Sequence, residues 1–328
     1  MGEVEKRKGG KKLIKMMKPY EKWFEKEIPT FYTAKQIQVV TLLETIDPCI
    51  FRTDVEGLDV ISTVAGIENK DIITRSLIFK RKKVAARRRT GKQLLRKLLE
   101  NVPSDAKDQC FLNQGLCGRC IDCTLFGYVN PNGQRQSRVH DGVCFSIRPY
   151  ESIYEVFNWN AIQEDTQAPG QAFGDIEVIK PGVVYPDVST LQSVTYDEFI
   201  YYLWCILNTR RYGAVTSRTG RAKVKPVAIL FSDSELITSL ELTQKYYDVL
   251  KKEKLLDQIV LSIEVLAKFS DEVIKSLVEE NANSHYELLD LANTETFLKD
   301  FRRYYVKDTE VFYNLIKELE GRVEKRKK

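Results

Sequence analysis

The chain has 328 residues, of which 43% are hydrophobic and 30% are charged. This balance is typical of a water-soluble globular protein, and the length suffices for one large domain or two ordinary ones. No apolar run approaches the roughly 18 residues that a membrane-spanning helix needs, which excludes that class. The first residues are basic and lack the apolar stretch of a secretory signal, so we expect a cytoplasmic protein that does not contact a membrane.

Positive charge is concentrated in the N-terminal third of the chain. The net charge is only +5, yet residues 1–100 carry 23 Lys and Arg against 13 Asp and Glu. Residues 226–328, in contrast, carry 16 against 20. This asymmetry predicts a local contact with a polyanion; the alternative is a basic surface that is merely solvated.

The first part of the chain has the pattern of one helix followed by three strands. Residues 11–27 place apolar side chains at the three- and four-residue spacing of an amphipathic helix, which Pro29 closes. Residues 36–46 are β-branched and aliphatic, as is typical of a buried strand. Residues 58–64 and 72–79 are two further candidate strands on either side of a turn.

The remainder alternates between strands and helices. From Lys80 the stretch KRKKVAARRRTGKQLLRKLLE begins as a block of positive charge and ends as an amphipathic helix. Residues 195–208 predict an apolar helix with Thr195 as its N-cap, and from Asp233 onward the pattern is predominantly helical. Three more segments have strand character: 143–148, 153–157 and KPVAILF. This alternation indicates an α+β fold with a sheet core and long insertions.

Four of the seven cysteines lie close together in the segment CFLNQGLCGRCIDCTLFG. They are Cys110, Cys117, Cys120 and Cys123. Overlapping CxxC pairs bring thiolates to one ion at little cost to the chain, and four thiolates complete the tetrahedron that structural zinc prefers. The sequence therefore predicts a structural Zn²⁺ site.

Alternatives to this metal site stay open. His140 or Cys144 is near enough in sequence to replace one of the four ligands. An iron–sulfur cluster also uses CxxCxxC spacing, and the cysteines could bind no metal. The isolated Cys49 and Cys205 are expected to be small core residues.

Two segments combine positive charge with features that suit RNA. The first holds Lys80, Arg81, Lys82, Lys83, Arg87, Arg88 and Arg89. The second holds Arg210, Arg211, Arg218, Arg221, Lys223 and Lys225, with Tyr212, Gly213 and Gly220 between them. Arginine matches phosphate oxygens bidentately, glycine lets the backbone approach closely, and an aromatic ring can stack on an unpaired base. We interpret both as basic loops, and a solvated loop is the alternative for either one taken alone.

The sequence contains no recognisable catalytic motif. Walker, dinucleotide-binding, nucleophile-elbow and HExxH patterns are missing. Of the two histidines, His285 lies in a polar stretch and is expected at the surface. Asp47 and Asp54 follow the first strand and are candidates for metal-dependent RNA cleavage, although turn formation is the usual role of such residues.

CGRCIDCTLFG and RRYGAVTSRTGR resemble two segments of the RAMP superfamily of CRISPR effector complexes. The first is similar to a cysteine-rich C-x-x-C-x-LFG segment, and the second to a glycine- and arginine-rich stretch after a helix. With the strand at 36–46 and the long insertions, the order resembles the backbone subunit of Cascade-type complexes, most closely that of subtype I-D. The likeness spans most of residues 30–230.

The resemblance implies an RRM-like (ferredoxin-like) βαββαβ core with a zinc-binding insertion, a lid-like insertion and additional C-terminal helices. The implied regions are the discontinuous core at 30–79 plus 143–232, the basic and zinc-binding insertion at 80–142, the flexible loop at 158–175, and the helical region at 233–328. The aromatic submotif of RRM domains is missing, so we do not expect bases to stack on the sheet.

The resemblance also implies a non-catalytic subunit that binds single-stranded guide RNA (crRNA). Copies would self-associate along the guide beside other CRISPR complex subunits, opposite a target nucleic acid. Arg52 after the first strand, the 80–92 segment and the 210–221 segment would face RNA. The alternatives are a metal-dependent ribonuclease of the same superfamily and a scaffold whose zinc module recruits a protein partner.

Overall fold

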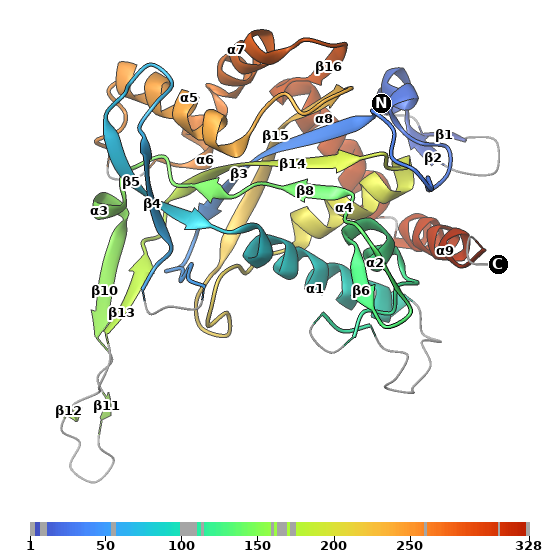
Figure 1. Ribbon diagram of the computed structural model, residues 1–328, viewed down its shortest axis with the longest axis horizontal. Helices are drawn as coiled ribbons and strands as arrows, with labels where there is room; N and C mark the ends of the chain where they lie inside the picture. The colour runs from blue at the N-terminus through green and yellow to red at the C-terminus, as the bar shows by residue number, and fades with distance from the viewer. Residues whose placement is uncertain are drawn as a thin grey trace.

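A five-stranded antiparallel sheet forms the centre of the protein, with strand order β16-β15-β3-β14-β8 (Figure 1). The computed structural model describes residues 4–6, 12–53, 57–98, 110–112, 115–158, 161–162, 169–170, 175–258, 261–307 and 309–325. Helices cover both faces of this sheet, and the expected mixture of helices and antiparallel strands is confirmed. No helix in the described ranges is long and apolar enough to cross a membrane.

The elements follow one another along the chain with these bounds. The strands are β1 (Val4–Lys6), β2 (Lys12–Ile14), β3 (Gln36–Thr45), β4 (Val60–Val64), β5 (Ile72–Ile78), β6 (Tyr128–Asn130), β7 (Gly133–Arg135), β8 (Val139–Asp141), β9 (Cys144–Phe145), β10 (Tyr154–Asn158), β11 (Ala161–Ile162), β12 (Pro169–Gly170), β13 (Asp175–Ile179), β14 (Val184–Gln192), β15 (Ala222–Ser232) and β16 (Tyr286–Leu289). The helices are η1 (Lys15–Trp23), α1 (Lys80–Leu98), α2 (Ile121–Phe126), α3 (Tyr150–Ile153), α4 (Tyr196–Asn208), α5 (Ser239–Lys252), α6 (Ile263–Ala267), α7 (Ser270–Asn281), α8 (Leu291–Phe301), η3 (Arg302–Lys307) and α9 (Thr309–Lys325).

Strand β3 is the middle of the sheet and is buried on both faces. It pairs with β14 on one side and β15 on the other, and every residue after Gln36 is buried. Because side chains alternate along a strand, Ile37 and Val39 pack with α1, α4, α8 and α9. Val40 and Leu42 pack with α5, α6 and α7 on the opposite face. The continuous aliphatic run that predicted a buried strand thus serves two cores.

The chain visits the sheet in the order β3, α1, β8, β14, α4 and β15, with α1 and α4 on the same face. Helix α1 and strand β8 lie within residues 80–142, which the sequence analysis assigned to an insertion. Strand β8 pairs with β14, and α1 packs against α4. Both elements therefore pack with the central sheet, and the predicted boundary at residue 80 stays a prediction.

Other expectations are met or changed in detail. The strand predictions at 58–64, 72–79 and 153–157 correspond to β4, β5 and β10, and the 143–148 strand shrinks to β9. Strands β4, β5 and β9 form a separate three-stranded sheet, and β10 pairs with β13 in a long hairpin. The helix expected at 11–27 is a shorter 3-10 helix that contains Pro19. Most of the loop predicted at 158–175 lies outside the described residues.

Helix α4 begins where the sequence predicts it. The Thr195 hydroxyl accepts from the Glu198 backbone, and the Glu198 carboxylate accepts from the Thr195 backbone, which completes a capping box. Arg138 donates two hydrogen bonds to the same carboxylate and one to the Ser193 carbonyl. This buried ion pair between Arg138 and Glu198 fixes the N-terminus of α4 against the residue that precedes β8.

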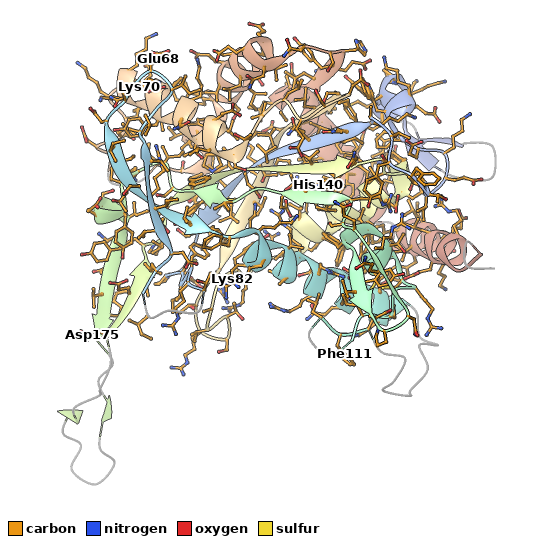
Figure 2. The ribbon with its side chains drawn as sticks, viewed as in Figure 1. Glu68, Lys70, Lys82, Phe111, His140 and Asp175 are labelled. Atoms are coloured by element: carbon orange, nitrogen blue, oxygen red, sulfur yellow. The ribbon has the colours of Figure 1, made fainter. Side chains whose placement is uncertain are left out.

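The charged segment from Lys80 is helix α1, and its first half is anchored to the sheet by buried ion pairs. Figure 2 shows Lys82 at the start of this helix and Phe111 beyond its other end. Lys83 and Arg87 both bind Asp187 of β14, and Arg87 also lies 3.0 Å from Asp141 of β8. All four side chains are fully buried. Burial alone raises the pKa of Asp187, but the two cations outweigh it and lower the value to about 2.

Replacing Asp187 by Asn should reduce the free energy of unfolding by about 3–5 kcal/mol, because two buried cations would then share the single carboxylate of Asp141. Urea denaturation followed by circular dichroism measures this difference. The matched control is Asp233→Asn in the exposed turn after β15, which should change the value by less than about 0.5 kcal/mol. Equal effects of the two substitutions would contradict the anchoring role of Asp187.

Candidate functional site

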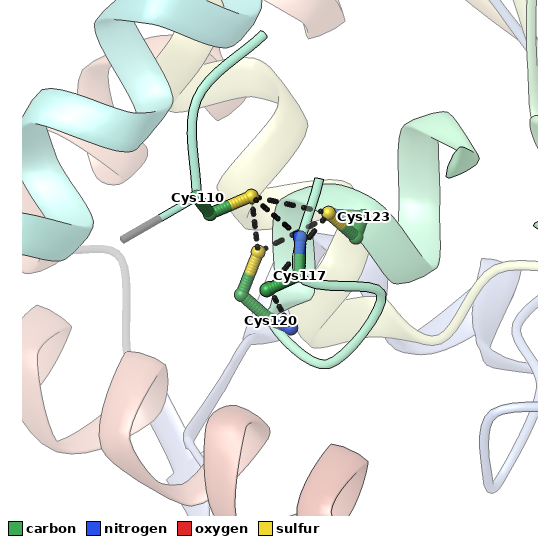
Figure 3. Close-up of side chains that lie close together, drawn as sticks. All are labelled: Cys110, Cys117, Cys120 and Cys123. Atoms are coloured by element: carbon green, nitrogen blue, oxygen red, sulfur yellow. Dashed lines mark hydrogen bonds between the residues drawn. The ribbon is translucent and has the colours of Figure 1, made fainter. Parts of the chain in front are cut away.

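The four clustered cysteines converge on one point (Figure 3). Their sulfur atoms all lie within 4.8 Å of one another. The Sγ–Sγ distances are 3.4 Å for Cys110 and Cys123, 3.9 Å for Cys117 and Cys123, and 4.0 Å for Cys110 and Cys120. Four thiolates at about 2.3 Å from a tetrahedral ion would be separated by about 3.8 Å. The cluster therefore has the dimensions to hold a metal ion.

Local backbone structure arranges these thiols. Gly118 in the CGRC knuckle has a φ of 66°, and a Cβ there would lie 2.6 Å from the ring of Tyr128. The Cys117 sulfur accepts backbone N–H groups from Arg119 and Cys120, each at 3.3 Å. Cys120 is the N-cap of α2 and accepts from the Cys123 backbone. The turn at Gly118 and the N-cap at Cys120 thus orient the sulfurs toward a common centre. Backbone N–H donors commonly orient thiolates in this way.

A cationic side chain that the sequence analysis did not single out lies against this cluster. Lys92 of α1 places its Nζ 2.7 Å from the Cys110 sulfur and 3.0 Å from Asp122. Arg88, one turn earlier, binds the same Asp122 carboxylate at 2.7 and 2.9 Å. Hydrogen bonds from Cys117, and then from Cys120 and Cys123, lower the pKa of Cys110. In the sequence, this contact is indicated by Asp122 inside CIDC, because a buried carboxylate needs a cationic partner.

The two substitute ligands lie elsewhere. Cys144 is fully buried in β9 beside Lys83 and Asp187, and burial raises the pKa of its thiol. His140 lies on β8 within the central sheet. Among the described residues, the group that could hold a metal contains only the four cysteines that the sequence analysis named first. His140 and Cys144 are therefore excluded as ligands in this arrangement.

Helix α1 divides the first basic segment into a buried side and a solvent side. Lys83 and Arg87 are fully buried in the ion pairs with the sheet, and Arg88 is 8% exposed against Asp122. These three side chains support the fold, and the expectation that they face RNA is corrected. Arg81 and Arg89 are exposed, whereas Lys80 and Lys82 are half-buried. Because residues seven or eight apart share a helix face, the exposed Arg96 extends the line of Arg81 and Arg89.

The second basic segment is a loop that folds back on the end of β3. Gly213 and Gly220 have φ values of 90° and 85°, and a Cβ at either would meet a backbone oxygen within about 2.5 Å. These close approaches let the Ala214 N–H donate to Ile50 and the Gly220 N–H donate to Pro48. The two glycines therefore allow the loop backbone to pack closely within the protein. They were expected instead to let the backbone approach a ligand.

The arginines of this loop differ in what they contact. Arg210, Arg218 and Arg221 are exposed, and Arg221 lies 3.6 Å from the Asp47 carboxylate. Arg211 is half-buried and donates to the carbonyls of Thr216 and Thr219 at 2.9 and 3.0 Å, so it fixes the loop shape. The remaining exposed side chains carry the positive charge that faces solvent.

The structure brings the predicted basic segments to one region. Phe51, Ala86 of α1 and Tyr212 of the 209–221 loop share one apolar cluster, and Arg52 follows Phe51 directly. Tyr212 is fully buried beside Arg87. The N-terminal half of α1, the segment after β3 and the basic loop therefore pack together and present their exposed arginines around a common core.

The acidic candidates for RNA cleavage do not form a site among the described residues. Asp47 faces Arg221, and Asp54 lies outside the described part of the chain. His285 is far from both in sequence and stacks on Trp23 with ring centroids 5.6 Å apart. Among the described residues, no group of three or more Asp, Glu, His or Cys side chains that could hold a metal ion includes Asp47.

A comparison with protein families relates this chain to CRISPR proteins. The family described as Csc2 CRISPR matches residues 23–314. The crystal structure of Thermofilum pendens Csc2 is 18% identical with a TM-score of 0.56, and the alignment covers 94% of this chain and 99% of that chain. At that identity the likeness shows a common fold. A search of curated proteins finds no match.

Two chains from larger assemblies are more distantly similar. A chain of a type IV-B CRISPR complex is 11% identical with a TM-score of 0.42, covering 57% of this chain and 89% of that chain. A chain of a CRISPR RNA-guided surveillance complex is 9% identical with a TM-score of 0.46, covering 77% and 88%. Because the family match extends over residues 23–314, the chain belongs to the Csc2 family of CRISPR proteins.

Proposed function

We propose that this chain is a guide-RNA-binding backbone subunit of a CRISPR complex of the Cascade type. The observation that carries the proposal is the convergence of exposed arginines from α1 and from the 209–221 loop around one apolar cluster. The two segments are more than a hundred residues apart in sequence, and the fold brings them together. A basic surface of this kind suits a phosphate backbone.

The revised RNA-contacting set follows from exposure. It comprises the exposed Arg81, Arg89, Arg210, Arg218 and Arg221, with the half-buried Arg52, Lys80 and Lys82 at its margin. Lys83, Arg87 and Arg88 hold α1 in place, and Arg211 holds the loop. Affinity would come from neutralising phosphates, so binding would tolerate different sequences and weaken with salt. The subunit would be non-catalytic.

An RRM-like core is the finer fold proposal. The order β15-β3-β14-β8, with α1 between the first and second of these strands along the chain and α4 between the third and fourth, is that of a βαββαβ ferredoxin-like unit. In this proposal the core consists of β3, α1, β8, β14, α4 and β15. The β4–β5 hairpin, the cysteine segment and the β10–β13 hairpin would be insertions, followed by the helical region from 233.

The cysteine cluster is proposed to bind structural Zn²⁺. The four sulfurs fit a tetrahedron, and all four coordination positions would be filled by protein, which leaves none for catalysis. Four thiolates around one Zn²⁺ carry a net charge of about −2, and the adjacent ammonium of Lys92 would offset part of it. The ion would cross-link Cys110 to Cys117, Cys120 and Cys123, and Lys92 would join this site to α1.

The assembly proposal follows from family membership together with this surface. Copies of the chain would line a single-stranded crRNA beside other CRISPR subunits, and the displayed guide would pair with a target nucleic acid. Subtype I-D is the proposed setting, as the sequence resemblance implies. The Csc2 family match supports the CRISPR setting, and the arginine surface supports the RNA contact.

The double substitution Arg89→Ala and Arg210→Ala should weaken binding to unstructured single-stranded RNA to a similar degree for every sequence. Loss of two phosphate contacts should make the log–log salt slope shallower by about 1.4. Fluorescence anisotropy of labelled oligonucleotides across a salt series measures both quantities.

The matched control removes two exposed lysines from the helices on the opposite face, Lys252→Ala and Lys275→Ala. It changes the net charge by the same amount, so it should leave the salt slope almost unchanged. If both double variants lower affinity equally, net charge alone explains binding and the proposed surface is wrong.

Freshly purified protein should contain about one zinc ion per chain by elemental analysis. Cys123→Ser should lose it and lower the melting temperature, because metal binding is coupled to folding. Cys49→Ser, which removes a buried thiol outside the cluster, should keep the metal. Iron in place of zinc, or a metal-free wild-type protein with an unchanged melting temperature in chelator, would refute this assignment.

Gly118→Ala should destabilise the protein by at least about 1–2 kcal/mol, since alanine pays the cost of the left-handed backbone and its Cβ meets Tyr128. Gly321→Ala is the control: it lies in α9 with nothing within 4 Å of its Cβ, and should stabilise by about 0.5–1 kcal/mol. Thermal denaturation of the zinc-loaded proteins distinguishes the two signs.

A further inference from the structure

An open pocket of about 460 Å³ lies where α1, α4, η3 and α9 meet. Its volume falls in the range of roughly 300–1,000 Å³ that is usual for small-ligand sites. The pocket is separate from the cysteine cluster and from the buried ion pairs, and no residue that the sequence analysis selected lines it. Its lining combines aromatic rings with amide, hydroxyl and ammonium groups.

The aromatic wall of this pocket is held in place by its own packing. Trp204 of α4 stacks on Phe312 of α9 with centroids 6.0 Å apart and an angle of 20° between the rings. Tyr305 meets Phe312 edge-on at 6.3 Å. Phe312 and Tyr305 are buried, while Trp204 and Tyr313 are partly exposed to the pocket. The wall therefore offers a preformed flat surface to a planar ligand.

Polar side chains complete the lining of the pocket. Gln93 and Lys97 come from the solvent face of α1, and Asn208 comes from the end of α4. The Asn208 side chain donates to the Trp204 carbonyl at 2.9 Å, which holds the amide beside the indole. Carboxamides present both a donor and an acceptor, which is the pattern found on the edge of a nucleobase.

The mouth of the pocket is flanked by the proposed RNA surface. Arg89 is the residue before Thr90, which lines the pocket, and Arg210 follows the lining residue Asn208 by two positions. The hydroxyls of Thr90 and Thr209 are 3.1 Å apart, so the two segments meet at this edge. A strand whose phosphates contact Arg89 and Arg210 would carry its bases past the opening.

The sheet itself offers no comparable platform. Both faces of β3 are covered by helices, with Ile37 and Val39 in one core and Val40 and Leu42 in the other. Bases therefore cannot stack on the centre of the sheet. The aromatic pocket beside α1 combines a stacking surface with neighbouring arginines.

We infer that this pocket accepts one unstacked base of the bound single-stranded RNA, stacked on Trp204 and hydrogen-bonded at its edge by Gln93 and Asn208. The inference rests on the proposed RNA-binding function and adds a base-binding position to it. A charged phosphate alone would not use the indole, and an apolar peptide would leave the amides and Lys97 unsatisfied.

The test compares oligouridine with an abasic oligomer of equal length. Trp204→Ala should weaken oligouridine binding about tenfold and leave the salt slope unchanged, because a stacking contact is lost and no phosphate contact is. Binding of the abasic oligomer should be the same in both proteins. Oligouridine should also quench tryptophan fluorescence in the wild type and much less in Trp204→Phe, which keeps a stacking ring and most of the affinity.

Because truncation of Trp204 also removes packing on Phe312, a milder variant accompanies it. Gln93→Ala sits on an exposed helix position, should fold normally, and should selectively weaken oligouridine binding. Equal oligouridine affinity in wild type, Trp204→Ala and Gln93→Ala would overturn the base-binding role of the pocket. If the Arg89→Ala/Arg210→Ala variant nevertheless bound RNA more weakly, the proposed RNA surface would stand. Absence of binding by the wild type to either oligomer would overturn both.

Discussion

The carboxylate of Asp187 is the constraint on which the arrangement of the protein depends. It projects from β14, which pairs with the central strand β3, and is fully buried between Lys83 and Arg87 of α1. A buried carboxylate without cations would be strongly unfavourable, so the helix must present these two side chains inward. Once they are fixed, the periodicity of the helix turns Arg81, Arg89 and Arg96 to solvent. A single buried interaction thus decides which basic residues are structural and which face outward.

Helix α1, which is fixed by Asp187, also contacts the cysteine cluster. Arg88 directly follows Arg87, and Lys92 lies one turn further along α1. Both bind Asp122, and Lys92 also contacts the Cys110 sulfur. Glu320 of α9 accepts the Ile121 N–H at the start of α2 and joins the C-terminal helix to this segment. The position of the thiols is therefore coupled to the central sheet through charged contacts. Since such contacts are costly when one partner is lost, the cluster and the exposed arginines hold a fixed relation to each other.

The sequence was informative wherever a structure depends on local pattern. The aliphatic run of β3, the Thr195 N-cap of α4 and the close spacing of the four cysteines all have short-range signatures, and the structure has the buried strand, the N-cap and the converging thiols. It misled where the outcome depends on distant partners. No residue near Lys83 in the sequence indicates that Asp187, over a hundred residues later, pairs with it in the interior. Lys83 was therefore predicted to contact RNA. The RNA-contacting roles themselves stay predictions.

Covering both faces of the sheet has a functional consequence. In a fold whose sheet surface is open, aromatic side chains on the strands can receive bases directly. Here the two cores occupy both sides of β3, so any nucleic acid must lie along the helices and loops at the margin. That margin carries the exposed arginines of α1 and the 209–221 loop, and the aromatic pocket opens beside them. Phosphate contacts and base contacts would therefore come from different elements, with α1 supplying residues to both.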